Sequence, residues 1–297
     1  MELIGNVFYY QWEVDLMAAL QTGMNDFLIW LANFFSIFGE QFVLVGIIAF
    51  CYFIYDKEMA KTLAIDIMTG LIWGPMIKNV AVRRRPYFDN PSISCLRPVD
   101  PSANIYDIEA QGYSFPSAHS LMGGITYPGL AVRIRKKWTA ALAVCLPLLI
   151  GVSRFCLGVH YPTDVFCGLL LGLAIVFLLG FLRKKIKNNN ILNIIILLTG
   201  IPGLFYCTTT DFFDGYGLLI GSVFAFIFEE KYVDFERAGS VKNAVLRLLL
   251  GLAVFLAISK GLKLVLPANM ATRLIRYALA AFAALGPYTL LFEKFKI

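Results

Sequence analysis

The chain has 297 residues, of which 59% are hydrophobic and only 15% are charged, and its mean hydropathy is +0.70. Soluble domains contain about 25% charged residues, so an ordinary water-soluble globular protein is excluded. The net charge of +6 does not predict nucleic-acid binding, because the basic residues lie in short clusters between apolar stretches, as they do in membrane proteins. The composition therefore predicts an all-α protein that crosses a membrane several times.

The chain begins with an amphipathic segment, residues 1–23, that is expected to lie at the membrane interface. A spanning helix needs about 20 mostly apolar residues. By that rule ten helices follow, the first two of them short: 24–39, 41–56, 59–83, 117–133, 138–158, 162–182, 190–207, 215–230, 242–266 and 271–292. The first six are expected to form a helical core, residues 24–189. The last four form a C-terminal group, residues 190–297, to which the sequence assigns no role.

Positive charge is unevenly divided between the loops. Lys and Arg in short loops are retained on the cytoplasmic side, and most of them lie in one set of loops, in clusters at 135–137 and 183–187 and also at Arg237 and Lys296. Alternating ten helices across this bias places both termini in the cytoplasm, on the inner side of what is expected to be a bacterial plasma membrane. The connection 84–116 then faces outward. It is long and polar, and such loops commonly carry function.

The only two histidines, His119 and His160, both lie where apolar helices meet the outward face. Either one alone is most simply a hydrogen-bonded anchor. However, Pro162 suits the first turn of a helix, which places Asp164 in that turn, near enough to His160 to accept the proton on Nδ1. The Nε2 atom would then be unprotonated, the form in which imidazole acts as a nucleophile or a base.

Three cations lie near the same predicted face. Lys78 and Arg85 close the helix 59–83, and a spacing of seven residues would put both side chains on one helix face, about 10 Å apart along the axis. Taken alone, such residues usually extend to lipid headgroups. Arg154 lies within an apolar helix, where an arginine without a partner costs at least about 2.5 kcal/mol. The three together could hold one anion.

The order of these elements resembles a known family. Lys78-(six residues)-Arg85-Pro86, Pro116-Ser117-Ala118-His119 and Ser153-Arg154-(five residues)-His160-(three residues)-Asp164 match the signatures K-x6-R-P, P-S-G-H and S-R-x5-H-x3-D of the type 2 phosphatidic acid phosphatase superfamily. The resemblance covers residues 24 to 183. Ala118 replaces the usual glycine, so a phosphate cradle that needed an unusual φ there would be altered.

The resemblance implies the roles of the residues. His160 would attack phosphorus and form a phosphohistidine, Asp164 would orient it, and His119 would protonate the leaving alkoxide and later activate water. The phosphoryl oxygens would be held by Lys78, Arg85, Ser117, Ala118 and Arg154. No metal or other cofactor is implied. The expected substrate is a lipid phosphate or a polyprenyl pyrophosphate within the membrane.

Other functions stay open at this point. A lipid phosphotransferase would use the same phosphohistidine with an alcohol acceptor. A vanadium-type haloperoxidase has a similar site, but such enzymes are soluble. A non-enzymatic transporter would also explain many helices with buried charges. The sequence gives no oligomeric state.

Two further groups of residues have structural interpretations. Asp66 lies roughly 18 Å along its helix from Lys78, too far for the phosphate site, and is expected to bond a neighbouring helix. The six cysteines include no C-x-x-C pair, so no zinc or redox motif is predicted. Cys95 and Cys207 fall in or beside loops on the same predicted side, which leaves a disulfide between them open.

Overall fold

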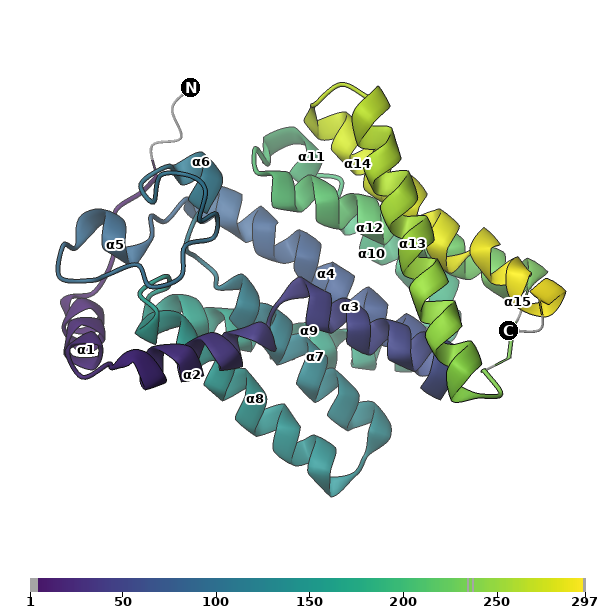
Figure 1. The fold of residues 1–297 in the computed structure, drawn as a ribbon, viewed down its shortest axis with the longest axis horizontal. Helices are drawn as coiled ribbons and strands as arrows, with labels where there is room; N and C mark the ends of the chain where they lie inside the picture. Colours follow the sequence, from purple (N-terminus) through teal and green to yellow (C-terminus); the bar gives the residue numbers. More distant parts are fainter. Residues whose placement is uncertain (1–4, 234, 237, 296–297) are drawn as a thin grey trace. The chain divides into compact units, whose positions relative to one another are not determined.

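The computed structural model describes residues 5–233, 235–236 and 238–295, and helices make up most of it (Figure 1). Arg237 and Lys296, two members of the predicted cytoplasmic charge set, lie outside the described residues. The chain forms two compact units, Met1–Leu44 with Trp73–Leu178 (unit 1), and Val45–Ile72 with Leu179–Ile297 (unit 2). The predicted all-α fold class is confirmed. The predicted boundary at residues 189 and 190 stays a prediction.

Unit 1 contains all the residues of the predicted signatures. Its helices are α1 (Gln11–Thr22), α2 (Asp26–Ile37), α5 (Pro86–Asp89), α6 (Ile108–Gln111), α7 (Ala118–Ile134) and α8 (Lys137–Cys156), with parts of α3 (Gln41–Phe50), α4 (Lys57–Ala81) and α9 (Pro162–Lys185). Helices α7 and α8 form a hairpin, and α2 packs against α8 (Figure 1).

Helices α7 and α9 approach closely because glycine lies at their contact. A Cβ atom added to Gly172 would be 2.7 Å from the carbonyl oxygen of Leu121, and one added to Gly124 would be 2.9 Å from that of Leu169. Small residues allow such close backbone approach between membrane helices. The contact matters for function because α7 begins at the Ser117 signature and α9 begins beside His160.

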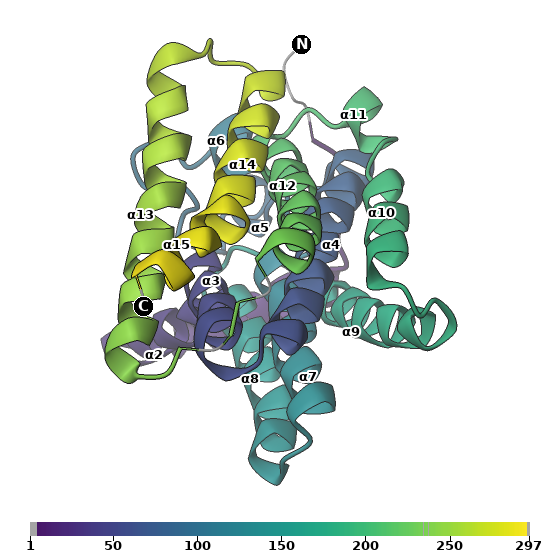
Figure 2. The ribbon, with the colours of Figure 1, turned by 90° about the vertical axis from the view of Figure 1, so that its right-hand side faces the viewer.

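Unit 2 contains the C-terminal helices and the first part of α4. Its remaining elements are a π-helical turn (Cys51–Tyr55), α10 (Asn189–Thr199), α11 (Gly203–Tyr206), α12 (Thr210–Tyr232), α13 (Val241–Val265), α14 (Met270–Leu285), a 3-10 turn (Pro287–Thr289) and α15 (Leu290–Phe295). Helices α12 and α13 each pack against α14 (Figure 2). Asp66 is buried and pairs with Arg183 of α9 at 2.6 Å, so the predicted helix-to-helix bond of Asp66 is confirmed.

The structure has fewer clear spans than the ten predicted. Within the described residues, six segments are long and apolar enough to cross a membrane: Lys137–Cys156, Pro162–Lys185, Asn189–Tyr206, Thr210–Tyr232, Val241–Val265 and Met270–Phe292. The predicted helices 24–39 and 41–56 form a pair bent by 44°, either one broken span or a re-entrant loop. The predicted span 117–133 is absent from the six because α7 has only 17 residues. The predicted span 59–83 is absent because polar residues such as Lys61 and Asp66 lower the mean hydropathy of α4.

The N-terminal residues lie on the same face of unit 1 as the signature loops. Asn6 forms an isolated parallel bridge with Arg83, and Val14 and Met17 of α1 pack in one buried cluster with Tyr87 and Leu157. Ten alternating helices would instead place the N-terminus opposite the connection 84–116. The described N-terminal residues pack with the connection 84–116, and α2 and α3 form one bent pair. The cytoplasmic side of both termini stays a prediction.

Helix α4 ends earlier than predicted. Its last residue is Ala81, and Val82 adopts a left-handed conformation with φ of 43°, which a β-branched residue rarely adopts. The chain then pairs with Asn6, whose backbone N–H donates to the carbonyl oxygen of Val82 at 2.7 Å. Lys78 and Arg85 therefore do not share one helical face, and the predicted helical geometry of this pair is wrong.

Candidate active site

Lys78 and Arg85 are buried and are held by backbone carbonyl groups. The Nζ atom of Lys78 donates to the carbonyl oxygen of Tyr113 at 3.1 Å. Arg85 precedes helix α5, where it donates through Nε to the carbonyl oxygen of Gln111 at 2.9 Å and through Nη1 to that of Val159 at 2.9 Å. The last contact connects the first signature to the residue before His160.

His160 and Asp164 lie next to each other, but at a distance longer than a hydrogen bond. Helix α9 begins at Pro162 as predicted, and Nδ1 of His160 is 3.6 Å from Oδ2 of Asp164. That oxygen accepts hydrogen bonds from the hydroxyl of Ser114 and from the N–H of Tyr161. Catalytic hydrogen bonds are often long without substrate and shorten in the reacting complex.

The other oxygen of Asp164 pairs with Arg83, a residue to which the sequence assigned no role. The Nη1 atom of Arg83 donates to Oδ1 of Asp164 at 2.6 Å, and its Nη2 atom donates to Oε2 of Glu13 at 2.9 Å. All three charged side chains are buried. The sequence signal was Glu13 itself, an acidic residue between Trp12 and Val14, which needs a partner when it is buried.

The second signature forms the start of helix α7. Ser117 is the N-cap residue, and its hydroxyl accepts from the hydroxyl of Ser120 at 3.0 Å. Its N–H donates to the carbonyl oxygen of Asp164 at 3.0 Å, which connects the second signature to the third. Ala118 is the first residue of the helix and has no positive φ. The local backbone therefore does not require the glycine that the family usually has there.

His119 contacts a carboxylate that the sequence analysis did not assign to the site. Its Nε2 atom is 3.2 Å from Oε1 of Glu40, and the same oxygen accepts from Nη2 of Arg97 at 2.7 Å. Glu40 lies in the bend between α2 and α3, beside Gly39. A Cβ atom on Gly39 would lie 3.0 Å from the Cβ atom of His119, so this glycine allows the histidine to pack against the bend. The sequence signal was the Gly39-Glu40 break between two apolar stretches.

Arg154 lies at the end of α8, buried, and donates through Nη1 to the hydroxyl of Ser36. Its Nε atom is buried and has no hydrogen-bond partner among the described residues. Buried polar atoms are normally hydrogen-bonded. The unpartnered Nε atom of Arg154 is consistent with a site that is completed by a ligand.

The electrostatic environment of His160 is positive. Burial lowers the pKa of His160 well below its usual value, and the charges of Arg85, Arg154 and Lys78 lower it further, in that order. His160 is therefore neutral at physiological pH, with a nucleophilic lone pair available on one nitrogen. The surrounding cations favour an anionic ligand.

The described residues contain no alternative metal site and no disulfide. Within the described residues, no group of three or more His, Cys, Asp or Glu side chains is placed to hold a metal ion. All six cysteines, each within the described part of the chain, are free thiols, including Cys95 and Cys207.

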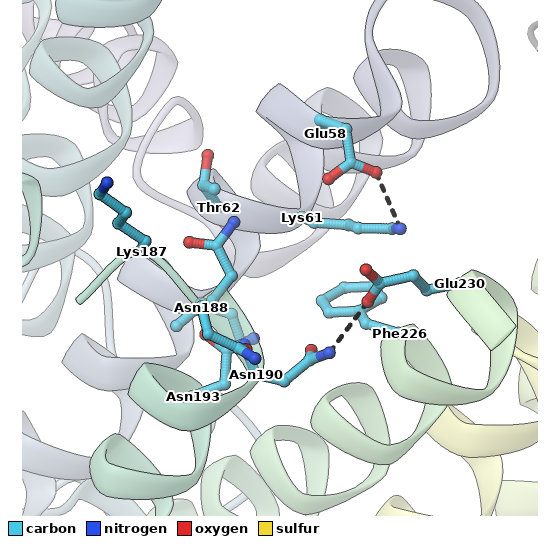
Figure 3. A pocket seen from close by; sticks show the side chains of 11 residues that line it. Glu58, Lys61, Thr62, Lys187, Asn188, Asn190, Asn193, Phe226 and Glu230 are labelled. Atoms are coloured by element: carbon cyan, nitrogen blue, oxygen red, sulfur yellow. Dashed lines mark hydrogen bonds and ion pairs between the residues drawn. The ribbon is translucent and has the colours of Figure 1, made fainter. Parts of the chain in front are cut away.

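Unit 2 contains a separate polar cavity of about 420 Å³ (Figure 3). Figure 3 shows that Lys61, which lines it, pairs with Glu58, and that Asn190 donates to Glu230. Lys61 also pairs with the buried Glu229 at 2.6 Å. None of the signature residues lines this cavity, so it is not the predicted site.

Fold and site together define a multi-pass membrane protein in which two histidines are accompanied by buried cations. Residues 58–188 match the PAP2 superfamily, and residues 213–297 match the PAP2 superfamily phosphatase, transmembrane extension. The chain belongs to the PAP2 superfamily, and the predicted resemblance is confirmed.

Curated relatives were found in an archaeon and a bacterium. The undecaprenyl-diphosphatase of Sulfolobus acidocaldarius is 28% identical over 183 residues, which cover 60% of this chain and 82% of the relative. The phosphatidylglycerophosphatase B of Bacillus subtilis is 36% identical over 90 residues, 27% of this chain and 44% of the relative. The chain thus spans less than half the length of this second relative.

Two solved structures are also similar. LpxE of Aquifex aeolicus has a TM-score of 0.47 and 24% identity, covering 55% of this chain and 92% of that one. The PAP2-type phosphatidylglycerolphosphate phosphatase of Bacillus subtilis has a TM-score of 0.44 and 25% identity, covering 60% of this chain and 87% of that one.

The burial of a neutral His160 predicts that acid destabilises the protein. The pKa of His160 in the folded state lies below its ordinary value of 6.5, so below that pH the unfolded chain binds the proton more readily. As the pH is lowered below 6.5, this group should therefore reduce the free energy of unfolding by at most about 1.4 kcal/mol per pH unit. At higher pH the protonation of His160 should not affect stability. Thermal melting of wild type and His160→Gln should diverge between about pH 7 and pH 5, with the smaller loss in the variant. Parallel curves would contradict a buried neutral histidine.

Proposed function

We propose that the chain is an integral membrane lipid phosphatase that hydrolyses a phosphomonoester or pyrophosphate headgroup through a phosphohistidine, without a metal ion. The observation that carries this proposal is the buried neutral His160, on which three cations act from different parts of unit 1. A neutral imidazole among positive charges is suited to attack an anionic phosphate.

In the first step His160 attacks phosphorus in line with the leaving group. Its Nδ1 atom faces Asp164, so Nε2 is the attacking atom. The new bond joins Nε2 to phosphorus as the bond from phosphorus to the lipid oxygen breaks. His119 gives a proton to that oxygen, and the lipid leaves as an alcohol, or as a lipid monophosphate when the substrate is a pyrophosphate.

In the second step water replaces His160 on phosphorus. His119, now unprotonated, takes a proton from the attacking water, and inorganic phosphate leaves from a regenerated neutral His160. Asp164 stabilises the positive charge that the His160 ring carries while it is phosphorylated. Its 3.6 Å contact with Nδ1 would shorten to a hydrogen bond at that stage.

Negative charge on the phosphoryl oxygens is redistributed in the transition state of both steps. Lys78, Arg85 and Arg154 supply cations, and Ser117 and the N–H of Ala118 supply donors at the start of α7, where a helix favours anions. Donors placed in this way contribute on the order of 3 kcal/mol each to transition-state stabilisation. These cations take the place that a metal ion fills in other phosphoryl-transfer sites.

The relatives suggest two substrate classes. One relative is named for a polyprenyl diphosphate and the other for a phosphatidylglycerophosphate, and both are anionic lipids that a membrane protein can admit from the bilayer. We therefore propose a lipid phosphate or pyrophosphate as the substrate. Transfer to an alcohol rather than to water would use the same intermediate and would appear as a new phosphate ester.

The site is proposed to face outward. Helices α7 and α9 begin at the site and end at the basic residues 133–137 and 183–185, which positive charge retains in the cytoplasm. The N-terminal residues share the face of the site, so they are placed outside as well. Counting four crossings after α9 places the C-terminus in the cytoplasm of the expected plasma membrane.

The purified protein should release phosphate from undecaprenyl diphosphate or phosphatidylglycerophosphate in the presence of EDTA. His160→Ala and His119→Ala should each lower kcat by at least about 1,000-fold, with a melting temperature close to that of wild type. Normal turnover in His160→Ala would remove the nucleophile assignment. Loss of activity in EDTA alone, restored by a metal, would contradict the metal-free mechanism.

Glu40 should matter most when the leaving group is a poor one. We infer that its carboxylate, 3.2 Å from Nε2 of His119, orients the ring that protonates the leaving oxygen, and proton donation is needed most by basic alkoxides. In single-turnover experiments Glu40→Gln should slow release of the lipid alcohol at least about 10-fold and release of p-nitrophenol from its phosphate less than about threefold. Glu109→Gln, an exposed residue of the same unit, is the control. Equal slowing for both leaving groups would contradict this role.

The proposed orientation is tested by cysteine labelling in intact cells. On a background without the natural cysteines, Ser102→Cys in the connection 84–116 should react with a maleimide that does not cross membranes. Lys137→Cys, at the start of α8, should react only after permeabilisation. Both positions are exposed. The reverse pattern would place the site in the cytoplasm.

A further inference from the structure

A buried ion pair connects the N-terminal helix to the carboxylate beside His160. We propose that Glu13 of α1 and Arg83 act as positioning residues, which hold Asp164 so that its Oδ2 atom stays directed at Nδ1 of His160. This inference rests on the proposed function, because it gives Asp164 the task of orienting the nucleophile. It also makes helix α1 part of the catalytic apparatus.

The guanidinium of Arg83 is fixed on every side. It donates to the carbonyl oxygen of Phe8 through Nε at 2.8 Å, to Thr163 and Asp164 through Nη1, and to Glu13 through Nη2. Its Cζ atom also lies 4.0 Å from the ring centre of Tyr161 and 4.7 Å from that of Phe8. A planar cation held at its edges and over two aromatic rings has little freedom to rotate.

Glu13 is equally constrained. Its Oε1 atom accepts from the N–H of Thr163 at 3.0 Å and from the hydroxyl of Thr163 at 2.6 Å. Its Oε2 atom accepts from the N–H of Tyr10 at 3.0 Å and from Nη2 of Arg83 at 2.9 Å. Thr163 is the residue before Asp164, so Glu13 holds both the backbone of the α9 first turn and the cation that pairs with Asp164.

As a consequence, the two carboxylate oxygens of Asp164 have different partners. Oδ1 takes the strong charged bond from Arg83, whereas Oδ2 accepts from Ser114 and the N–H of Tyr161 and faces His160. A carboxylate bound only by neutral groups could rotate and exchange the two oxygens. With Arg83 anchored by Glu13, rotation would break a buried ion pair, so the oriented arrangement is retained.

Charge balance gives Glu13 a second task. If Arg83 paired with Asp164 and not with Glu13, the pair would be neutral. It would then stabilise a positively charged His160 less than the group that includes Glu13 does. Two carboxylates around one guanidinium leave a net charge of minus one beside the imidazole. The proposed phosphohistidine carries positive charge on its ring, and this remaining negative charge stabilises it.

The test is a double-mutant cycle in the full-length protein, measured with undecaprenyl diphosphate or phosphatidylglycerophosphate in detergent. Glu13→Gln should lower kcat by about 10- to 100-fold, as removal of supporting contacts does elsewhere, with KM changed by less than about threefold. Asp164→Asn should lower kcat further. In the Asp164→Asn background, Glu13→Gln should cost less than about threefold, because the group through which it acts is already altered.

Two variants separate positioning from general stability. Asp15→Asn lies on the same helix, is exposed, and contacts only Gln11 in the described hydrogen bonds, so it should keep wild-type kcat. Arg83→Lys keeps the charge but loses the planar fork, and it should be slow yet recover part of the activity missing in Arg83→Gln. Should Glu13→Gln fail to fold, Arg83→Lys and its own double variant with Asp164→Asn provide the same cycle.

The outcomes distinguish the two proposals. Wild-type kcat in both Glu13→Gln and Arg83→Lys, or an equal loss from Glu13→Gln with and without Asp164, would overturn the positioning role while leaving the proposed function intact. Wild-type activity in Asp164→Asn and His160→Ala would instead overturn the proposed histidine mechanism itself.

Discussion

The arrangement of unit 1 follows from the need to keep several cations buried around a neutral histidine. Lys78 and Arg85 donate to carbonyl oxygens and Arg154 donates to a hydroxyl, and these hydrogen bonds orient the three cations. Positive potential is thereby retained at His160. The two carboxylates that contact the histidines are each paired with an arginine, Asp164 with Arg83 and Glu40 with Arg97. A site built in this way attracts phosphate and leaves the nucleophile unprotonated.

This arrangement requires close helix packing and a strained backbone conformation. Glycines at the contact of α7 and α9 allow two helix ends to approach, so that the second and third signatures meet through the hydrogen bond from Ser117 to Asp164. Val82 takes a left-handed conformation, of a kind that costs on the order of 1–3 kcal/mol. This turn lets Arg83 point into unit 1 while Arg85 reaches the carbonyl of Val159.

The sequence predicted what is local and could not predict what depends on distant contacts. The start of α9 at Pro162 and the three signatures follow from patterns within a few residues. The partners of the signature residues do not, since Glu13 is far from Arg83 along the chain and Glu40 is far from His119. The rule that a carboxylate among apolar residues requires a partner indicates that Glu13 and Glu40 each need one. The rule does not identify that partner.

The span count shows a second limit of sequence patterns. Hydropathy identifies apolar stretches, but it does not distinguish two short helices from one bent element, as α2 and α3 demonstrate. The difference changes the number of crossings before the connection 84–116, and the expected side of the N-terminus depends on that number. The segment expected to lie on the membrane surface also contributes Glu13 to the surroundings of the site, while Trp12 and Leu16 of the same helix are exposed.

The central claim is that His160 carries the phosphoryl group, and the most direct measurement is to trap that intermediate. His119→Ala should still be phosphorylated by p-nitrophenyl phosphate, whose leaving group needs no proton, but should hydrolyse the product slowly. After an alkaline quench, peptide mapping of the labelled protein should find phosphate on His160, in a linkage stable to alkali and labile to acid. Phosphate on any other residue, or turnover without a labelled enzyme, would contradict the account.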